Sequence, residues 1–209
     1  MGPVSDAGRG PAGASQVPDG WLADLDRIFA TTVDRVPNDT FTEPTALPGW
    51  TNAHVIAHVH FNALALCRLI GWARTGVESS MYASAAQRAE EIEHGATKEP
   101  MYLRKLVKAS AERFTAEFAG LTETQRRRII VTAQGRHITA AELAWLRCRE
   151  LGVHAVDLAA GTGFDDLPDG FADALVNEIL AKRLAAGEGP VLASWLAGRE
   201  PATPLGRWL

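Results

Sequence analysis

Glu150 and His154 are the residues of this sequence whose types and spacing point most directly to chemistry. They stand four positions apart in a segment, residues 139–159, whose apolar pattern predicts a helix. On a helix, side chains at this spacing lie one above the other, with Cβ atoms about 5–6 Å apart. A carboxylate and an imidazole placed in this way either hold a divalent metal ion or form a surface ion pair. A metal ion needs at least one further ligand from elsewhere in the chain.

A histidine cluster in an earlier predicted helix, His54, His58 and His60, can supply that ligand. Two residues turn a helix by about 200°, so His60 points away from the other two and is predicted to be partly exposed or hydrogen-bonded. The ligand is predicted to be His58, with His54, one turn nearer the helix start, as the alternative.

Two imidazoles and one carboxylate leave at least one coordination position open, which is typical of a catalytic rather than a structural metal site. The predicted set contains no cysteine, and zinc is the first choice of metal. Iron(II) is the main competitor, because two histidines and one carboxylate also form the facial triad of iron oxygenases.

Polar residues near these candidates could orient them or bind a cofactor. Asp157 lies one turn after His154 and could hydrogen-bond its ring. Arg147 lies about two turns before His154 on the same face, and both residues could instead belong to surface ion pairs. Arg147 and Asn62 are the candidates for cofactor binding. Since no Ser-His-Asp arrangement, phosphate-binding loop or dinucleotide fingerprint stands out, the metal would have to carry the chemistry of an enzyme.

Four long segments with helical spacing of apolar residues are expected to position these side chains. Thr139 and Glu142 match a capping box that opens the last segment, and residues 129–138 are expected to form a small hairpin with its turn at Gln134-Gly135. Four long helices with medium connections predict a mainly α, up-down four-helix bundle, which places metal sites between facing helices. The four segments are residues 21–36, 51–74, 100–121 and 139–159.

The composition divides the chain into three parts. Residues 1–17, rich in Gly, Pro, Ala and Ser, are predicted to be a flexible tail because they have little apolar surface to bury. Residues 18–166 form the predicted bundle, and residues 167–209 form a short helical segment, a truncated C-terminal appendage too small for an independent domain.

The bulk numbers describe a soluble globular protein: 209 residues, 46% hydrophobic and 22% charged. A net charge of −4 argues against nucleic acid or an anionic membrane as the main partner. No apolar run is expected to approach the roughly 18–20 residues that are needed to span a bilayer. Cys67 and Cys148 are expected to be buried free thiols, with a disulfide as the alternative. Without the features of a signal peptide, the protein is expected in the cytoplasm, as a monomer or homodimer.

Several separate motifs between residues 21 and 166 resemble the mycothiol-dependent maleylpyruvate isomerase family, whose members are DinB-like four-helix bundles. Because these motifs agree in order and spacing, the resemblance is more specific than a shared fold. The motifs are Leu47-Pro48-Gly49-Trp50-Thr51, His54-Val55-Ile56-Ala57-His58, Asn62-Ala63, Met81-Tyr82-Ala83, Glu91-Ile92-Glu93-His94-Gly95-Ala96 and Arg149-Glu150-Leu151-Gly152-Val153-His154-Ala155-Val156-Asp157-Leu158.

The resemblance implies a divalent metal held by His58, Glu150 and His154. It also implies a low-molecular-weight thiol, mycothiol, whose thiolate binds the metal and attacks an electrophilic substrate. In the isomerase, reversible addition to a conjugated double bond permits rotation, whereas related members transfer the thiol. An arginine of the C-terminal region helps to bind or turn over the substrate, and Arg199 is its best match. The family usually carries a second α/β domain there, for which residues 167–209 leave little room.

The expected function is that of a metal-dependent enzyme that uses such a thiol to isomerise or S-conjugate a small anionic electrophile. His58 and Arg199 are its predicted catalytic residues. One alternative is a metal-binding bundle that acts as a sensor or binding module without catalysis, because the sequence shows no nucleophile or base outside the metal shell. A third possibility is an iron enzyme that uses dioxygen.

Overall fold

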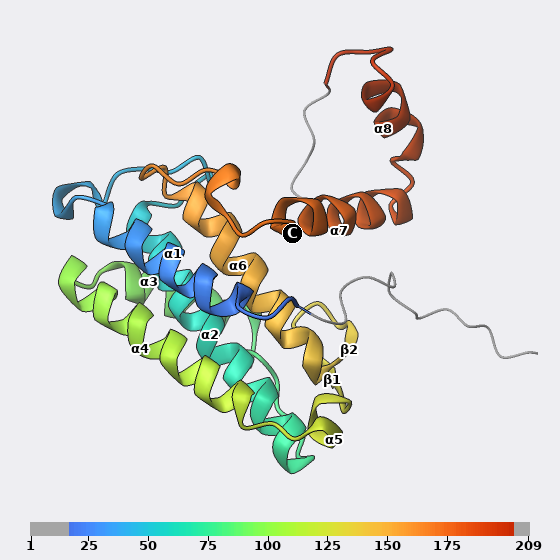
Figure 1. The fold of residues 1–209 in the computed structure, drawn as a ribbon. Helices are drawn as coiled ribbons and strands as arrows, with labels where there is room; N and C mark the ends of the chain where they lie inside the picture. Colours follow the sequence, from blue (N-terminus) through green and yellow to red (C-terminus); the bar gives the residue numbers. More distant parts are fainter. Residues whose placement is uncertain (1–16, 203–209) are drawn as a thin grey trace, which may run out of the picture. The chain divides into compact units, whose positions relative to one another are not determined.

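The structure, a computed structural model, describes residues 17–202. Within that range the chain forms two compact units, residues 17–168 and residues 169–202. The larger unit is the predicted mainly α four-helix bundle with a small hairpin (Figure 1). Its long helices are α1 (Trp21–Arg35), α2 (Asn52–Thr75), α4 (Pro100–Ala119) and α6 (Leu143–Asp157), and its shorter elements are η1 (Asn38–Thr40), α3 (Ala85–Ala96), α5 (Glu123–Arg126), β1 (Ile129–Val131), β2 (His137–Thr139), η2 (Ala140–Glu142) and η3 (Phe164–Asp166).

The helices of the bundle do not pack in the order of the sequence. Helix α1 packs mainly on α6 and α4, whereas α2 packs mainly on α4, α3 and α6. The consecutive helices α1 and α2 therefore lie diagonally across the bundle from each other. As a result α2 and α6, which carry the predicted metal ligands, are neighbours although residues 76–142 separate them in the sequence (Figure 1).

Local sequence explains how α6 begins. Strands β1 and β2 pair antiparallel with Ile130 opposite Ile138, and Gly135 in the connecting turn has a φ of 74°, as the predicted hairpin requires. The backbone N–H of Thr139 donates to Glu142 Oε1 at 2.9 Å, which confirms the predicted capping box. The capping box opens the short 3-10 helix η2, through which the hairpin leads into α6, the helix that carries Glu150.

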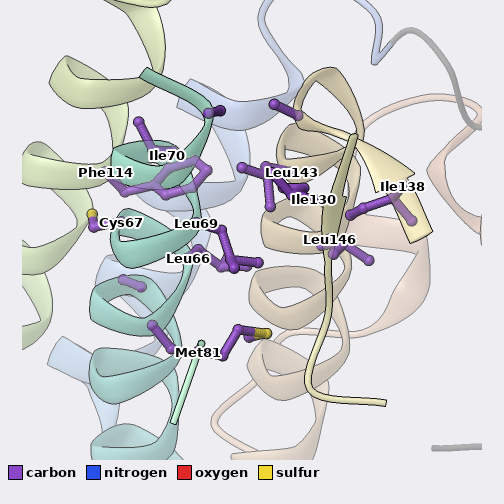
Figure 2. Packing of buried hydrophobic residues seen from close by; sticks show 14 of the residues in the cluster. Leu66, Cys67, Leu69, Ile70, Met81, Phe114, Ile130, Ile138, Leu143 and Leu146 are labelled. Carbon is purple, nitrogen blue, oxygen red and sulfur yellow. The ribbon is translucent and has the colours of Figure 1, made fainter. Parts of the chain in front are cut away.

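Buried apolar side chains from α2, α4, α6 and the hairpin form one core cluster (Figure 2). Leu66 and Leu69 of α2, Phe114 of α4 and Leu143 of α6 are fully buried within it. Because these residues come from elements distant in sequence, the cluster fixes the positions of α2 and α6 relative to each other.

Cys67 on α2 and Cys148 on α6 are buried free thiols, as the sequence analysis predicted. Burial raises the pKa of Cys67 to about 11 and that of Cys148 to about 12. Both thiols therefore stay protonated at neutral pH, and neither is a ready nucleophile.

Helix α2 is long and apolar enough, by length and composition alone, to cross a membrane. The expectation that no apolar run approaches this length was therefore wrong for α2. The most apolar 18-residue window of the helix is 72% buried inside the protein. Its packing on α3, α4 and α6 accounts for apolar residues on several sides of one helix.

The described part of the smaller unit consists of α7 (Phe171–Ala185) and α8 (Gly189–Leu196), in the region that was predicted to be a short helical segment. Gly187, with a φ of 82°, lies in the turn between them, and Arg183 Nη1 donates to Glu188 Oε2 at 2.6 Å. The predicted tail, residues 1–17, lies outside the described residues except for its last position. The three-part division of the chain remains a prediction.

Candidate metal site

His58, Glu150 and His154 converge between α2 and α6. His58 Nε2 lies 2.9 Å from Glu150 Oε2, and His154 Nε2 lies 3.5 Å from the same oxygen. The three side chains are largely buried, with 7%, 12% and 13% of their surface exposed. One potential ligand atom from each residue lies within 4.8 Å of the other two. The three side chains are therefore close enough together to share one metal ion.

The second ring nitrogen of each histidine has its own partner. His154 Nδ1 donates to Asp157 Oδ2 at 2.8 Å, so Asp157 has the position expected of a residue that orients a ligand. His58 Nδ1 faces Arg88 Nη2 at 3.3 Å. The Nε2 atoms of both rings therefore face the Glu150 carboxylate. Nε2 is thus the nitrogen that each ring would offer to a metal.

His54, the alternative ligand, is engaged elsewhere. Its Nδ1 accepts hydrogen bonds from the Thr51 hydroxyl at 2.7 Å and from the Thr51 N–H at 3.2 Å, as part of a capping box at the start of α2. Its Nε2 donates to Glu93 at 3.2 Å. His60 is buried on another side of the helix and donates from Nδ1 to the Leu106 carbonyl at 3.0 Å, as its predicted orientation required. Among the three histidines of α2, only His58 joins the cluster.

Burial and hydrogen bonding change the pKa values of the three side chains in opposite directions. Burial alone would raise the pKa of Glu150, but hydrogen bonds from His154 and His58 hold it well below its usual range. Burial would lower the pKa of His154, yet hydrogen bonds to Asp157 and Glu150 raise it to about 9. Burial lowers the pKa of His58 despite its hydrogen bond to Glu150. A protonated His154 therefore supplies positive charge beside the carboxylate, together with Arg149, whose Nη2 lies 3.7 Å from Glu150 Oε1.

Three residues that the prediction did not name as site residues adjoin the cluster. The Trp50 ring centroid lies 5.2 Å from that of His58 and 6.5 Å from that of His154. Arg88 contacts His58, and its Cζ lies 6.0 Å from the centroid of the Tyr82 ring. Two of the three stand in motifs that carried the family resemblance, which was the available signal. Arg88 has no such signal, because only the packing of α3 on α2 brings it to the cluster.

The other predicted site residues lie in different surroundings. Arg147 is fully buried, with Nη1 donating to the Val59 carbonyl at 2.8 Å and Nη2 lying 3.8 Å from Asp26 Oδ1. Asn62 is buried, and within residues 17–202 its Oδ1 has no hydrogen-bond partner. Arg199 follows α8 in the smaller unit, where its backbone N–H donates to the Ser194 carbonyl at 2.9 Å. Cofactor binding by Arg147 and Asn62, and catalysis by Arg199, remain predictions.

The crossed helix order and a cluster of two histidines and one carboxylate between α2 and α6 define a DinB-like four-helix bundle with a candidate metal site. A sequence profile of the mycothiol maleylpyruvate isomerase N-terminal domain matches residues 22–159. The chain therefore belongs to the mycothiol maleylpyruvate isomerase family, as its motifs predicted.

Solved structures agree with this assignment. The crystal structure of the mycothiol-dependent maleylpyruvate isomerase matches with a TM-score of 0.74 and 40% sequence identity, covering 76% of this chain and 66% of that chain. A histidine-to-alanine mutant of the isomerase matches with the same TM-score of 0.74 and 39% identity, and the coverage is again 76% and 66%. The chain thus spans about two thirds of the isomerase's length.

A more distant structure shares the fold alone. YfiT from Bacillus subtilis, described as a probable metal-dependent hydrolase with an unusual four-helix bundle topology, matches with a TM-score of 0.54 and 18% identity. It covers 68% of this chain and 85% of that chain. Comparison with curated proteins finds no match.

Proposed function

We propose that this chain is a metal-dependent enzyme that uses a mycothiol-type thiol to isomerise or S-conjugate a small anionic electrophile. The observation that carries the proposal is that one potential ligand atom each from His58, Glu150 and His154 lies within 4.8 Å of the other two. Membership of a family whose crystallised isomerase depends on mycothiol supports the use of a thiol.

The donor set fits a divalent metal ion. It offers two neutral imidazole nitrogens, once His154 has lost its Nε2 proton, and one carboxylate that stays ionised. These ligands suit zinc, our first choice, and also iron(II). A bound divalent ion would lower the pKa of a thiol that joined it, so that the nucleophilic thiolate is present at neutral pH.

The chain's own residues would hold and shield that centre. Asp157 accepts the hydrogen bond from His154 Nδ1 and so keeps the His154 ring turned towards Glu150. The Trp50 ring packs beside both imidazoles and excludes water from one side of them. We propose that Arg199 binds or helps to turn over the substrate, and that Arg147 and Asn62 bind the thiol cofactor.

Metal analysis of purified protein tests the ligand assignment. We expect His58→Ala to lower the bound metal, measured by elemental analysis, from about one ion per chain to near zero, because three protein ligands become two. His54→Gln is the matched control on the same helix and should retain the metal. A His58→Ala protein that folds and keeps its full metal content would refute the assignment. The same analysis distinguishes zinc from iron.

A reaction assay tests the chemistry separately. Metal-loaded protein is incubated with mycothiol and maleylpyruvate, and the products are followed by NMR and mass spectrometry, with a parallel sample lacking thiol. Thiol-dependent formation of the trans isomer indicates an isomerase, and a stable thiol adduct indicates an S-transferase. A protein that binds metal but gives neither product would be a non-catalytic binding module or sensor. A cytoplasmic location and a monomeric or homodimeric state are proposed together with this function.

A further inference from the structure

Arg88, on α3, places a positive charge beside the candidate metal ligand His58. Its Nη2 lies 3.3 Å from His58 Nδ1, and its Cζ lies 6.0 Å from the centroid of the Tyr82 ring. The Arg88 side chain is partly buried. Within the part of the chain that the structure describes, no carboxylate forms an ion pair with it. The guanidinium of Arg88 therefore lies beside the candidate metal ligand His58 without a paired carboxylate among the described residues.

The packing of α3 holds Arg88 in this place. Ser84 caps the helix by accepting a hydrogen bond from the Gln87 N–H at 3.0 Å. Near the other end, a Cβ on Gly95 would lie 2.8 Å from the Ala57 Cβ and from Phe61 Cε2, so only glycine permits this approach to α2. The helix is therefore pressed against the segment of α2 that carries His58.

The contact between Arg88 and His58 depends on the metal-free state. A guanidinium can only donate hydrogen bonds, so Nδ1 of His58 must be the acceptor and the ring proton must lie on Nε2, facing Glu150. If Nε2 binds a metal, the proton of the neutral ring moves to Nδ1. Nδ1 and Arg88 are then both donors and no longer pair, which releases the Arg88 donor that faced His58 beside the metal site.

We propose that Arg88 binds a carboxylate of the electrophilic substrate beside the metal ligands. A guanidinium offers a planar fork of N–H donors that matches a carboxylate in two-point contact. The Tyr82 ring beside Arg88 would help to hold that fork in place. This inference rests on the proposed function for the identity of the ligand, a small anionic electrophile, and it deepens that proposal by naming a residue that recognises the substrate's charge.

Binding of maleate to the zinc-loaded protein, measured by isothermal titration calorimetry without thiol, tests the proposal. Arg88→Gln should weaken maleate binding about ten-fold or more, because charge-assisted two-point hydrogen bonds are lost. Arg88→Lys keeps the charge but not the fork, and should weaken binding less. Lys98→Gln removes one positive charge just after the end of α3 and should leave the affinity for maleate unchanged. The neutral diamide of maleic acid should bind equally to the wild type and Arg88→Gln.

Each other outcome overturns the proposal. It is wrong if Arg88→Gln binds maleate as tightly as the wild type, or if the wild type holds zinc but does not bind maleate. It is also wrong if Arg88→Gln loses zinc, because Arg88 would then position His58 rather than recognise substrate. The titration contains no thiol and so measures maleate binding independently of turnover. A protein that shows no turnover would contradict the proposed function, but the maleate affinities would still test the role of Arg88. The proposal is also wrong if the wild type takes up no metal, because His58 Nδ1 then remains the acceptor of the Arg88 donor.

Discussion

Two polar clusters lie inside the same bundle, and opposite forces dominate their titration. At Glu150 and His154 of the metal-ligand cluster, hydrogen bonds outweigh burial, so the pKa of Glu150 is lowered and that of His154 is raised to about 9, whereas burial still lowers the pKa of His58. In the pair of Asp26 and Arg147, burial outweighs the attraction, so the pKa of Asp26 is raised and that of Arg147 is lowered. The first cluster has contacts of 2.9 Å, whereas the second pair lies 3.8 Å apart.

The difference separates a candidate ligand set from an internal ion pair. Glu150 is approached by two imidazole nitrogens that could each give up a proton, so one cation can replace the protons. Asp26 faces a guanidinium that stays protonated and is fully buried, so no position for a metal ion arises there. A buried polar cluster therefore indicates a metal site when several of its atoms can direct lone pairs at the same point. Buried charge alone does not indicate one.

Asp26→Ala should give the largest effect on the stability of the fold. It leaves the fully buried Arg147 without its carboxylate, and we expect the free energy of unfolding to fall by about 3–5 kcal/mol. Chemical denaturation of the metal-free protein measures this loss. Metal content should stay at the wild-type level, and a simultaneous loss of metal would show that the two clusters are not independent.

Removing the metal should lower the free energy of unfolding somewhat less. With free metal at 100 times its dissociation constant, binding stabilises the native state by about 2.7 kcal/mol, so a chelator should remove about that amount. Glu150→Gln should abolish the difference between chelated and metal-loaded samples, because the carboxylate is lost while the shape is kept. If the chelator has the same effect on Glu150→Gln as on the wild type, the ion is bound elsewhere.

Gly95→Ala changes the contact between α3 and α2 near the cluster of His58, Glu150 and His154. It does not touch the pair of Asp26 and Arg147. The added methyl group would lie 2.8 Å from the Ala57 Cβ, so α3 must move away from α2 or the Phe61 ring must rotate. We expect a loss of about 2 kcal/mol in the free energy of unfolding from this overpacking. In an HSQC spectrum, the amide signals of α3 and of the facing part of α2 should shift, whereas those around Asp26 should not.

Asp157→Asn should have the smallest effect on stability, and the effect should depend on pH. The pKa of His154 is raised from 6.5 to about 9 in the metal-free fold, so its contribution is full below pH 6.5 and is lost as the pH rises through about 9. Weakening the hydrogen bond to the charged ring should cost about 1.5 kcal/mol at pH 6 and little at pH 9.5. Denaturation of chelated wild type and variant at both pH values measures this, and an equal cost at both would contradict it.

Sequence patterns sufficed for the parts of this molecule that depend on local spacing. Apolar periodicity and the Thr139 capping box predicted α6, and the spacing of Glu150 and His154 predicted that their side chains meet. The choice between His54 and His58 also had a local signal. A polar side chain three residues after the capping Thr51 is engaged in the cap, and this position is His54.

The remaining features depend on contacts between distant segments. Arg147 reads as a surface residue in its own helix, because its partner Asp26 lies on α1 and only the crossed helix order brings the two together. Arg88 is in the same position, since nothing in its local sequence indicates that α3 approaches His58. Charged residues whose partners are far apart in the chain were therefore the ones that sequence alone placed least well.

The diagonal arrangement of α1 and α2 has a consequence for assembly of the bundle. His58 and Glu150 are 92 positions apart, and the helices between and around them must all be docked before the two side chains meet. A partly folded chain would present only the local Glu150 and His154 pair, which holds an ion weakly. Tight uptake of an ion would then report completion of the tertiary structure, and the holo protein should exchange the amide hydrogens of α2 and α6 only through global opening.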